Sequence, residues 1–373
     1  METSKSKVAK IKINDIIRKY IVSFLIIFII FFTIFSSNLK SDAHQFTYDE
    51  LSIPILTYHK FCLGESTDEY TININHFKQQ MDYLKKNGYR VISVAQLLEC
   101  IEKNFFPEKP VVVTIDDGYK SVYTLAFPVL KEYGFPATLF LYTNFLANGS
   151  NQLSWSEIKE MAAMGMEIGS HTLSHANLLN QRTNECHLDY INRINKEIIL
   201  SKTILEKNTG NPVLSFAYPY GVYSEEIRML AKKAGYKALL NVNNMNNSIP
   251  IDPYSLNRQI IPNTGSLKQF QAIVEEKTLQ VNDIFPPDGT VTENQEITIG
   301  AILANHSIEP DSLYLRLSGS GLLNHNFSPE QQKISFTPVA PKFLQKRTWI
   351  AQITARDTET GQQRKISWLF TVR

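Results

Sequence analysis

The chain has 373 residues, of which 43% are hydrophobic, and this is enough for two or three domains with packed cores. Its formal net charge is only +2, so composition gives no basis for nucleic-acid binding. The cysteines number only 3 and are widely spaced, which excludes a disulfide framework.

The N-terminus predicts a membrane segment. Residues 1–19 are rich in lysine and arginine, and no charged residue then follows until Lys40. An uncharged, mostly apolar run of this length can cross a bilayer as a helix, with its positive flank on the cytoplasmic side. We therefore expect a basic cytoplasmic segment over 1–19, a transmembrane helix over 20–39 that anchors the protein in the cell membrane, and the catalytic part outside. A cleaved signal peptide is the alternative, and the protein would then be secreted.

Strand and helix patterns alternate from residue 48 to residue 280. Apolar runs such as 53–58 and 111–115 are typical of buried strands, and amphipathic runs such as 76–87 and 188–207 are typical of helices. This alternation predicts a parallel α/β sheet, and roughly six to eight units favour a (β/α) barrel over an open doubly wound sheet. No glycine-rich phosphate loop or dinucleotide fingerprint occurs in the sequence, so we expect no nucleotide cofactor.

The helical pattern stops near residue 280. A turn signal at 286–289 precedes alternating apolar runs, and the run 366–372 places its large apolar residues on one face. Short alternating strands at this spacing predict a small all-β, immunoglobulin-like sandwich over 284–373. The region carries no recognisable catalytic set, so we expect a spacer, with sugar binding by exposed aromatic residues as the alternative.

Three polar motifs follow predicted strands of the α/β region. They are residues 114–118 (TIDDG), 171–175 (HTLSH) and 216–221 (FAYPYG). Each motif alone is weak evidence, since Asp-Gly is an ordinary turn and aspartate caps helices well. In a parallel barrel, however, the carboxyl ends of the strands meet on one side, so the motifs should share one site. Two histidines and one aspartate can bind a divalent metal, and the second aspartate can then act as a general base.

Together the three motifs resemble those of the polysaccharide deacetylase (NodB-homology) family, which removes N-acetyl groups from amino-sugar polymers with a divalent metal in a distorted (β/α) barrel. The resemblance implies that Asp116 is the general base and that Asp117, His171 and His175 are the metal ligands. It also implies that the backbone amide of Tyr220 stabilises the oxyanion. We expect zinc, while cobalt, nickel and iron suit the same ligands.

Two departures from the family pattern point to one branch of the family. Ala217 stands where the third motif usually has arginine, and no late Leu-x-His motif occurs near residues 256–280. A histidine is found instead near the start, as His59 after the strand 53–58. Both features are similar to the poly-β-1,6-N-acetyl-D-glucosamine N-deacetylase branch, whose permuted barrel places the acid histidine first. By this resemblance, His59 protonates the leaving amine.

Three further residues are candidates for contact with the sugar. Trp155 could wall the acetyl pocket or fill core, Pro219 lies in the third motif, and Tyr218 could stack on a sugar or pack internally. We therefore expect removal of N-acetyl groups from an extracellular β-linked N-acetylglucosamine polymer of the biofilm type, with release of acetate. A peptidoglycan deacetylase is the alternative among enzymes. A non-catalytic carbohydrate-binding protein on the same fold is the alternative outside them.

Overall fold

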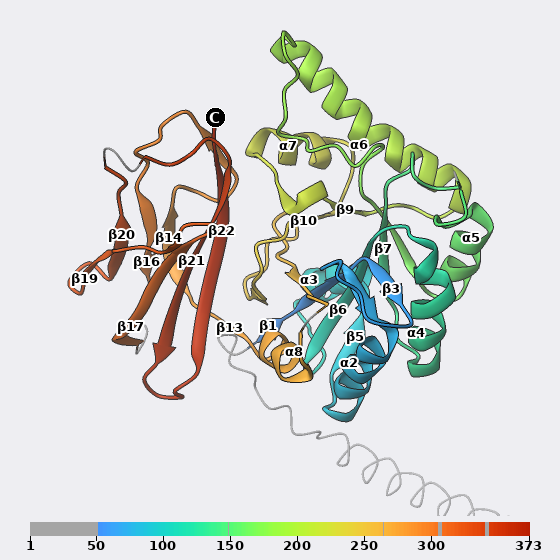
Figure 1. Cartoon of the computed structure of the whole chain (residues 1–373), viewed down its shortest axis with the longest axis horizontal. Helices are drawn as coiled ribbons and strands as arrows, with labels where there is room; N and C mark the ends of the chain where they lie inside the picture. The colour runs from blue at the N-terminus through green and yellow to red at the C-terminus, as the bar shows by residue number, and fades with distance from the viewer. Residues whose placement is uncertain (1–50, 148, 264, 305–307, 340–342) are drawn as a thin grey trace, which may run out of the picture. The chain divides into compact units, whose positions relative to one another are not determined.

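The computed structural model describes residues 51–147, 149–263, 265–304, 308–339 and 343–373 (Figure 1). The predicted basic segment 1–19 and the predicted membrane segment 20–39 lie outside the described residues. Within the described ranges, no helix combines the length and the apolar character needed to cross a membrane.

The α/β region is built on an eight-stranded sheet in which every strand pairing is parallel. Its strands are β2 (Ile55–Tyr58), β5 (Arg90–Ile92), β6 (Pro110–Asp117), β7 (Thr138–Leu141), β8 (Glu167–Ser170), β9 (Ser215–Ala217), β10 (Ala238–Leu240) and β12 (Gln259–Ile260). The strand order is β10-β9-β8-β7-β6-β2-β12, and β5 pairs with β6. Two further strand pairs flank it: β1 (Ser52–Ile53) with β11 (Asn247–Ser248), and β3 (Lys60–Cys62) with β4 (Thr71–Asn73).

Hydrogen bonds bring the two ends of this sheet together. Asn241 N donates to Leu256 O at 2.9 Å, and Leu256 N donates to Leu239 O at 3.0 Å. These bonds join the end of β10 to the segment that leads into β12. The parallel strands and their closing contacts fit the predicted (β/α) barrel.

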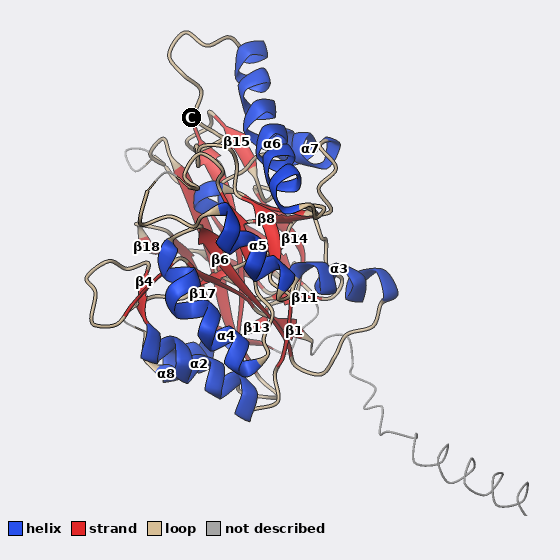
Figure 2. Ribbon diagram, turned by 90° about the vertical axis from the view of Figure 1, so that its right-hand side faces the viewer, coloured by secondary structure: helices blue, strands red, loops and turns tan. Residues whose placement is uncertain are grey.

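Helices follow most of the strands, close to where the sequence pattern predicts them. They are α2 (Ile74–Lys86), α3 (Val94–Lys103), α4 (Phe127–Tyr133), α5 (Trp155–Ala163), α6 (His187–Thr209), α7 (Glu225–Lys233) and α8 (Leu267–Val274), with a π-helical turn at Val122–Ala126 and a 3-10 turn at Pro219–Gly221. Helix α2 contacts both α4 and α8, as Figure 2 shows. Strand β6 is buried along its whole length, and its alternate residues belong to two apolar clusters: Val111 and Val113 to one, Val112 to the other. This burial on both faces explains why the strand reads as a continuous apolar run.

The C-terminal region consists of two mainly antiparallel sheets around one apolar core. One sheet contains β13 (Lys277–Thr278), β15 (Thr290–Thr292), β17 (Ile308–Leu317), β18 (Gly321–Leu322), β21 (Thr348–Asp357) and β22 (Gln363–Val372). The other contains β14 (Val281–Phe285), β16 (Ile299–Leu303), β19 (Asn326–Ser328) and β20 (Lys333–Phe336). Because β13 already pairs with β22, this all-β region begins before residue 284.

Candidate active site and metal centre

The two adjacent aspartates at the end of β6 take different positions. Side chains alternate along a strand, so Asp116 continues the row of Val112 and Thr114 on one face of β6, and it is 2% exposed. Asp117 leaves the strand with a φ of 76°, in the left-handed region that few non-glycine residues adopt. The change of backbone direction at this residue separates the two carboxylates and gives each its own set of neighbours.

Asp117, His171 and His175 form a compact set of metal donors. Asp117 Oδ1 lies 3.4 Å from His175 Nε2 and 3.9 Å from His171 Nε2. Ligand atoms of the three residues all lie within 4.8 Å of one another. Asp117 Oδ1 is buried and has no hydrogen-bond partner in the described part of the chain. A buried carboxylate oxygen is costly unless it is paired or binds a metal, so this donor set fits a divalent ion such as zinc.

The orientation of His171 prepares it for this role. His171 follows β8, and its Nδ1 lies 2.8 Å from the carbonyl oxygen of Ala217, which ends β9. With Nδ1 donating to this carbonyl, Nε2 keeps a lone pair for a metal. Burial lowers the pKa of His171 to about 3, which keeps the ring neutral. The contact uses only the backbone of Ala217, so the missing motif arginine does not disturb it.

Glu197 of α6 holds the loop that carries His175. The Glu197 side chain is 9% exposed. Glu197 Oε2 accepts from Leu173 N at 3.1 Å and from Ser174 N at 2.9 Å, while Oε1 accepts from Ser174 Oγ at 2.7 Å. Thr172 and His175 have φ values of 71° and 59°, and such strain is found where a surrounding structure holds it. Glu197 therefore positions the loop that carries the metal ligand. Glu197 lies outside the three sequence motifs, so no motif indicates this role.

A buried arginine elsewhere in the chain replaces the motif arginine whose position is occupied by Ala217. Arg258, which precedes β12, is 0% exposed, and its Nη1 donates to Asp116 Oδ1 at 2.7 Å. Its Nε donates to Asn241 O at 3.1 Å, and its guanidinium lies 5.4 Å from the centre of the Phe140 ring. Arg258 thus supplies the charge that the third motif lacks. The available signal was an arginine in a short segment that also holds the apolar residues Leu256, Ile260 and Ile261.

The pKa values of the two aspartates are consequently shifted in opposite directions. Burial alone would raise the pKa of Asp116, but the charge of Arg258 and its hydrogen bond to this carboxylate lower it to about 2. For Asp117, burial and the neighbouring Asp116 charge raise the pKa to about 7. Two carboxylates with separated pKa values are typical of sites that assign them different roles.

All the predicted catalytic and metal-binding residues line one cavity of about 300 Å³. The cavity is lined by His59, Lys60, Tyr70, Asp116, Asp117, Tyr119, His171, His175, Tyr220, Gly221, Val242, Arg258 and Ile260. The His59 ring packs against Tyr70 with centroids 5.0 Å apart, and burial lowers the pKa of His59. Tyr220 has a φ of 61°, and its ring lies 4.8 Å from that of His175.

The three residues predicted to contact sugar are not among those that line this cavity. Trp155 is the first residue of α5 and packs against the main apolar core. Tyr218 is 1% exposed and stacks on Tyr223 with centroids 4.9 Å apart. Pro219 is buried at the start of the 3-10 turn. The burial of Tyr218 favours the packing role that the sequence left open, and sugar contact by the other two stays a prediction.

Comparisons with known proteins agree with this geometry. Residues 103–239 match the family model for polysaccharide deacetylase. The Bacillus subtilis protein named "Putative polysaccharide deacetylase YxkH" is 32% identical over 186 residues, which cover 50% of this chain and 62% of that protein. The poly-beta-1,6-N-acetyl-D-glucosamine N-deacetylase of Staphylococcus epidermidis is 29% identical over 56% of this chain and 75% of that protein.

Two solved structures also resemble the chain. Streptococcus pyogenes deacetylase PplD, in complex with acetate, has a TM-score of 0.55 at 26% identity and covers 60% of this chain and 99% of its own. IcaB from Ammonifex degensii has a TM-score of 0.52 at 27% identity and covers 60% of this chain and 97% of its own. Residues 103–239 therefore match the polysaccharide deacetylase domain, and the proteins to which the chain is similar are named as deacetylases.

Proposed function

We propose that this protein removes N-acetyl groups from an extracellular β-linked N-acetylglucosamine polymer, of the poly-β-1,6 type, in a reaction that depends on a divalent metal. One observation carries the proposal. A single cavity holds an ionised aspartate with its arginine partner, a three-residue metal donor set and a histidine. The relatives named poly-beta-1,6-N-acetyl-D-glucosamine N-deacetylase support the choice of polymer.

Asp117, His171 and His175 would hold the metal, which when bound supplies an activated water and polarises the acetamide carbonyl. Asp116 accepts the proton of the attacking water. Its Oδ1 is engaged by Arg258, whereas its Oδ2 lies 3.8 Å from His171 Nε2, on the side of the metal donors. Oδ2 is therefore the oxygen placed to act as base.

His59 completes the reaction by donating a proton to the amine that leaves. An amide nitrogen leaves poorly without protonation, so an acid is needed on that side of the substrate. The negative charge of Asp116 favours protonation of His59, against the effect of its burial. The left-handed backbone at Tyr220 and Gly221, with φ values of 61° and 70°, supports a role for the Tyr220 amide in binding the oxyanion.

The test is acetate release by the full-length chain in detergent, with zinc added. β-1,6-linked N-acetylglucosamine oligomers and peptidoglycan would be compared, and Asp116→Asn would serve as the blank. Release from the β-1,6 oligomers supports the proposal. Release of acetate from peptidoglycan alone would contradict the proposed substrate but agree with the proposed deacetylation chemistry. Binding without release from either would favour a carbohydrate-binding protein on this fold.

The cellular location is a separate proposal that rests on the sequence alone. We propose that residues 20–39 anchor the chain in the cell membrane with the deacetylase domain outside, and that the β region acts as a spacer. Membrane fractionation of cells, followed by protease treatment of the intact cells, tests this arrangement. Recovery of the chain in the medium would indicate a cleaved signal peptide.

A further inference from the structure

The proposed acid, His59, lies directly before a short pair of strands. Lys60 begins β3, and the parallel pairing of β3 with β4 sets Lys60 opposite Thr71. The residues one step earlier, His59 and Tyr70, are therefore side by side, and Lys60 N donates to Tyr70 O at 3.1 Å. Both residues line the catalytic cavity. Their rings meet edge to face, with centroids 5.0 Å apart and an angle of 63° between the ring planes.

No acidic side chain in the described ranges forms an ion pair with His59. The histidine–carboxylate pairs found there belong to His171, His175 and His187. A general acid must be held within hydrogen-bond distance of the atom that receives its proton, so the His59 ring needs another support. In the part of the chain that the structure describes, Tyr70 provides the one aromatic contact of this ring.

Asp68 holds the segment that ends at Tyr70. Its Oδ1 accepts from Tyr70 N at 3.1 Å, and its Oδ2 accepts from Lys60 Nζ and Thr71 Oγ1, each at 2.9 Å. The hydrogen bonds from Lys60 and Tyr70 lower the pKa of Asp68 to about 2, so the carboxylate stays charged at neutral pH. One side chain thus joins the strand end that follows His59 to the strand end that follows Tyr70.

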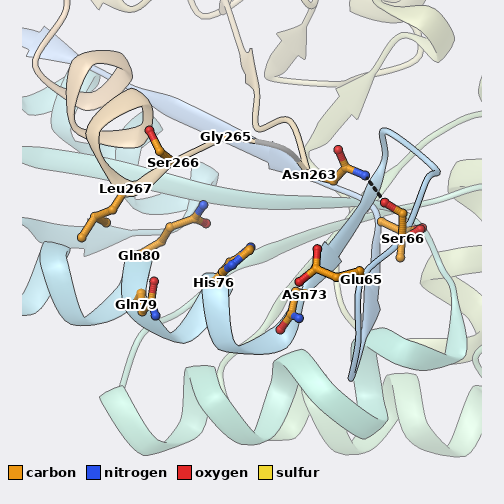
Figure 3. Close-up of a pocket in the computed structure, with 11 residues that line it drawn as sticks. Glu65, Ser66, Asn73, His76, Gln79, Gln80, Asn263, Gly265, Ser266 and Leu267 are labelled. Carbon is orange, nitrogen blue, oxygen red and sulfur yellow. Dashed lines mark hydrogen bonds between the residues drawn. The ribbon is translucent and has the colours of Figure 1, made fainter.

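A second tie comes from Asn263, which follows β12. Residue Ile260 of that strand lines the catalytic cavity. Asn263 Nδ2 donates to Ser66 O at 2.9 Å, the bond drawn in Figure 3, and to Asp68 O at 2.7 Å. Because its segment is bound by Asn263 as well as by Asp68, Tyr70 is held in place although it is 39% exposed.

We propose that Tyr70 is a positioning residue for the reaction. Its ring holds the imidazole of His59 in the orientation that delivers a proton to the leaving amine, and Asp68 holds Tyr70. This inference rests on the proposed function, in which His59 is the acid. An edge-to-face contact favours one orientation of the partner ring, and a small misplacement of a reacting group can slow a reaction strongly. The Tyr70 ring should therefore matter, and its hydroxyl should not.

The test compares two substrates that differ in their need for an acid. The β-1,6-linked N-acetylglucosamine oligomers lose an amine that must be protonated, whereas 4-nitrophenyl acetate loses a phenolate that leaves without a proton. In the full-length chain with zinc, Tyr70→Ala should lower kcat for the oligomers about 3- to 10-fold relative to ester hydrolysis. This is the size expected for one aromatic contact. The KM for the oligomers should not change. His59→Ala should show the same selectivity with a larger loss.

Three further variants sharpen the test. Tyr70→Phe keeps the ring and should restore the wild-type ratio of oligomer to ester hydrolysis. Asp68→Ala should lower this ratio as Tyr70→Ala does, although Asp68 does not line the catalytic cavity. Leu63→Ala is the control, because Leu63 lies in the same loop between β3 and β4, is 76% exposed and does not line that cavity.

Two results would overturn the positioning role alone. Equal effects of Tyr70→Ala on oligomer and ester hydrolysis, with His59→Ala selective, would show that Tyr70 does not act through the acid. A raised KM for the oligomers with unchanged kcat would show that Tyr70 contacts the sugar instead. The proposed function fails, and the positioning role with it, if the wild type releases no acetate or if His59→Ala slows both substrates alike.

Discussion

The α/β region and the β region differ in what they bury. The α/β region buries Asp116, Asp117, His171, Glu197 and Arg258, all in the candidate site or in contact with its residues and loops. The core of the β region is an apolar cluster, and Asp357 is a buried carboxylate at its edge. Because burying charge is costly, a cluster of buried charged groups indicates that the site uses them. Substitutions in the first region should therefore change chemistry, and those in the second should change stability.

The largest expected effect is that of Asp116→Asn. Loss of the general base should reduce acetate release about 100- to 10,000-fold. Metal content should remain near that of the wild type, because Asp116 is not part of the donor set. Activity within tenfold of the wild type would show that Asp116 is not the base.

Substitution of Arg258 should change the pH dependence of the reaction. The Arg258 charge helps to hold the pKa of Asp116 at about 2, so Arg258→Met raises that pKa. Because the ionised form is the active one, activity should then be lost at a higher pH as the solution is acidified. Breaking a buried ion pair should also lower the free energy of unfolding by about 3–5 kcal/mol. Arg258→Lys keeps the charge and should shift the pH dependence of activity less. Identical pH profiles for the wild type and both variants would contradict the role of Arg258 in lowering the pKa of Asp116.

Glu197→Gln tests how the metal-binding loop is held. The variant weakens the bonds to Leu173 and Ser174 and should lower metal affinity about 10- to 100-fold, the range known for groups that orient ligands. Competition with a zinc-binding dye measures this affinity. Glu206→Gln is a matched control on the same helix, since Glu206 binds Val213 N instead of the loop. Equal zinc affinities for the two variants would contradict the role of Glu197 in positioning the metal-binding loop.

Ile353→Ala probes the core of the β region. Ile353 is 0% exposed, and its truncation should lower the free energy of unfolding by about 2–5 kcal/mol. Denaturant unfolding measures this loss, and the rate per folded molecule should match the wild type. A slower rate per folded molecule would mean that the β region takes part in the reaction.

The smallest expected effect is that of substituting Asp357, a buried carboxylate that does not line the candidate active site. Hydrogen bonds from Thr360 N at 2.9 Å and Arg364 Nε at 2.7 Å lower its pKa to about 2 from an ordinary value of 3.8. Its stabilisation is therefore complete above the unfolded pKa and is lost as the pH falls toward about 2. Asp357→Asn should flatten the pH dependence of the free energy of unfolding between pH 4 and 2, without altering activity. An unchanged slope would contradict the prediction.

Local sequence patterns predicted most strands and helices close to where the structure has them, and the predicted catalytic and metal-binding residues line one cavity. Asp116 lies at the end of a strand, and His59 and His171 each follow a strand directly, so the strand pattern alone places them at one end of the sheet. The roles of Arg258 and Glu197 depend instead on contacts between residues far apart in the sequence. Arg258 meets Asp116 only because the sheet places β12 next to β2, which in turn pairs with β6, and no local pattern shows this.

The most direct test of the central claim is a metal titration. The full-length protein would be stripped with a chelator and titrated with zinc, while bound metal and acetate release from β-1,6-linked N-acetylglucosamine oligomers are measured together. We expect activity to rise in proportion to bound zinc up to one ion per chain, and His171→Ala to lose both metal and activity. Full activity in the stripped protein would contradict the account.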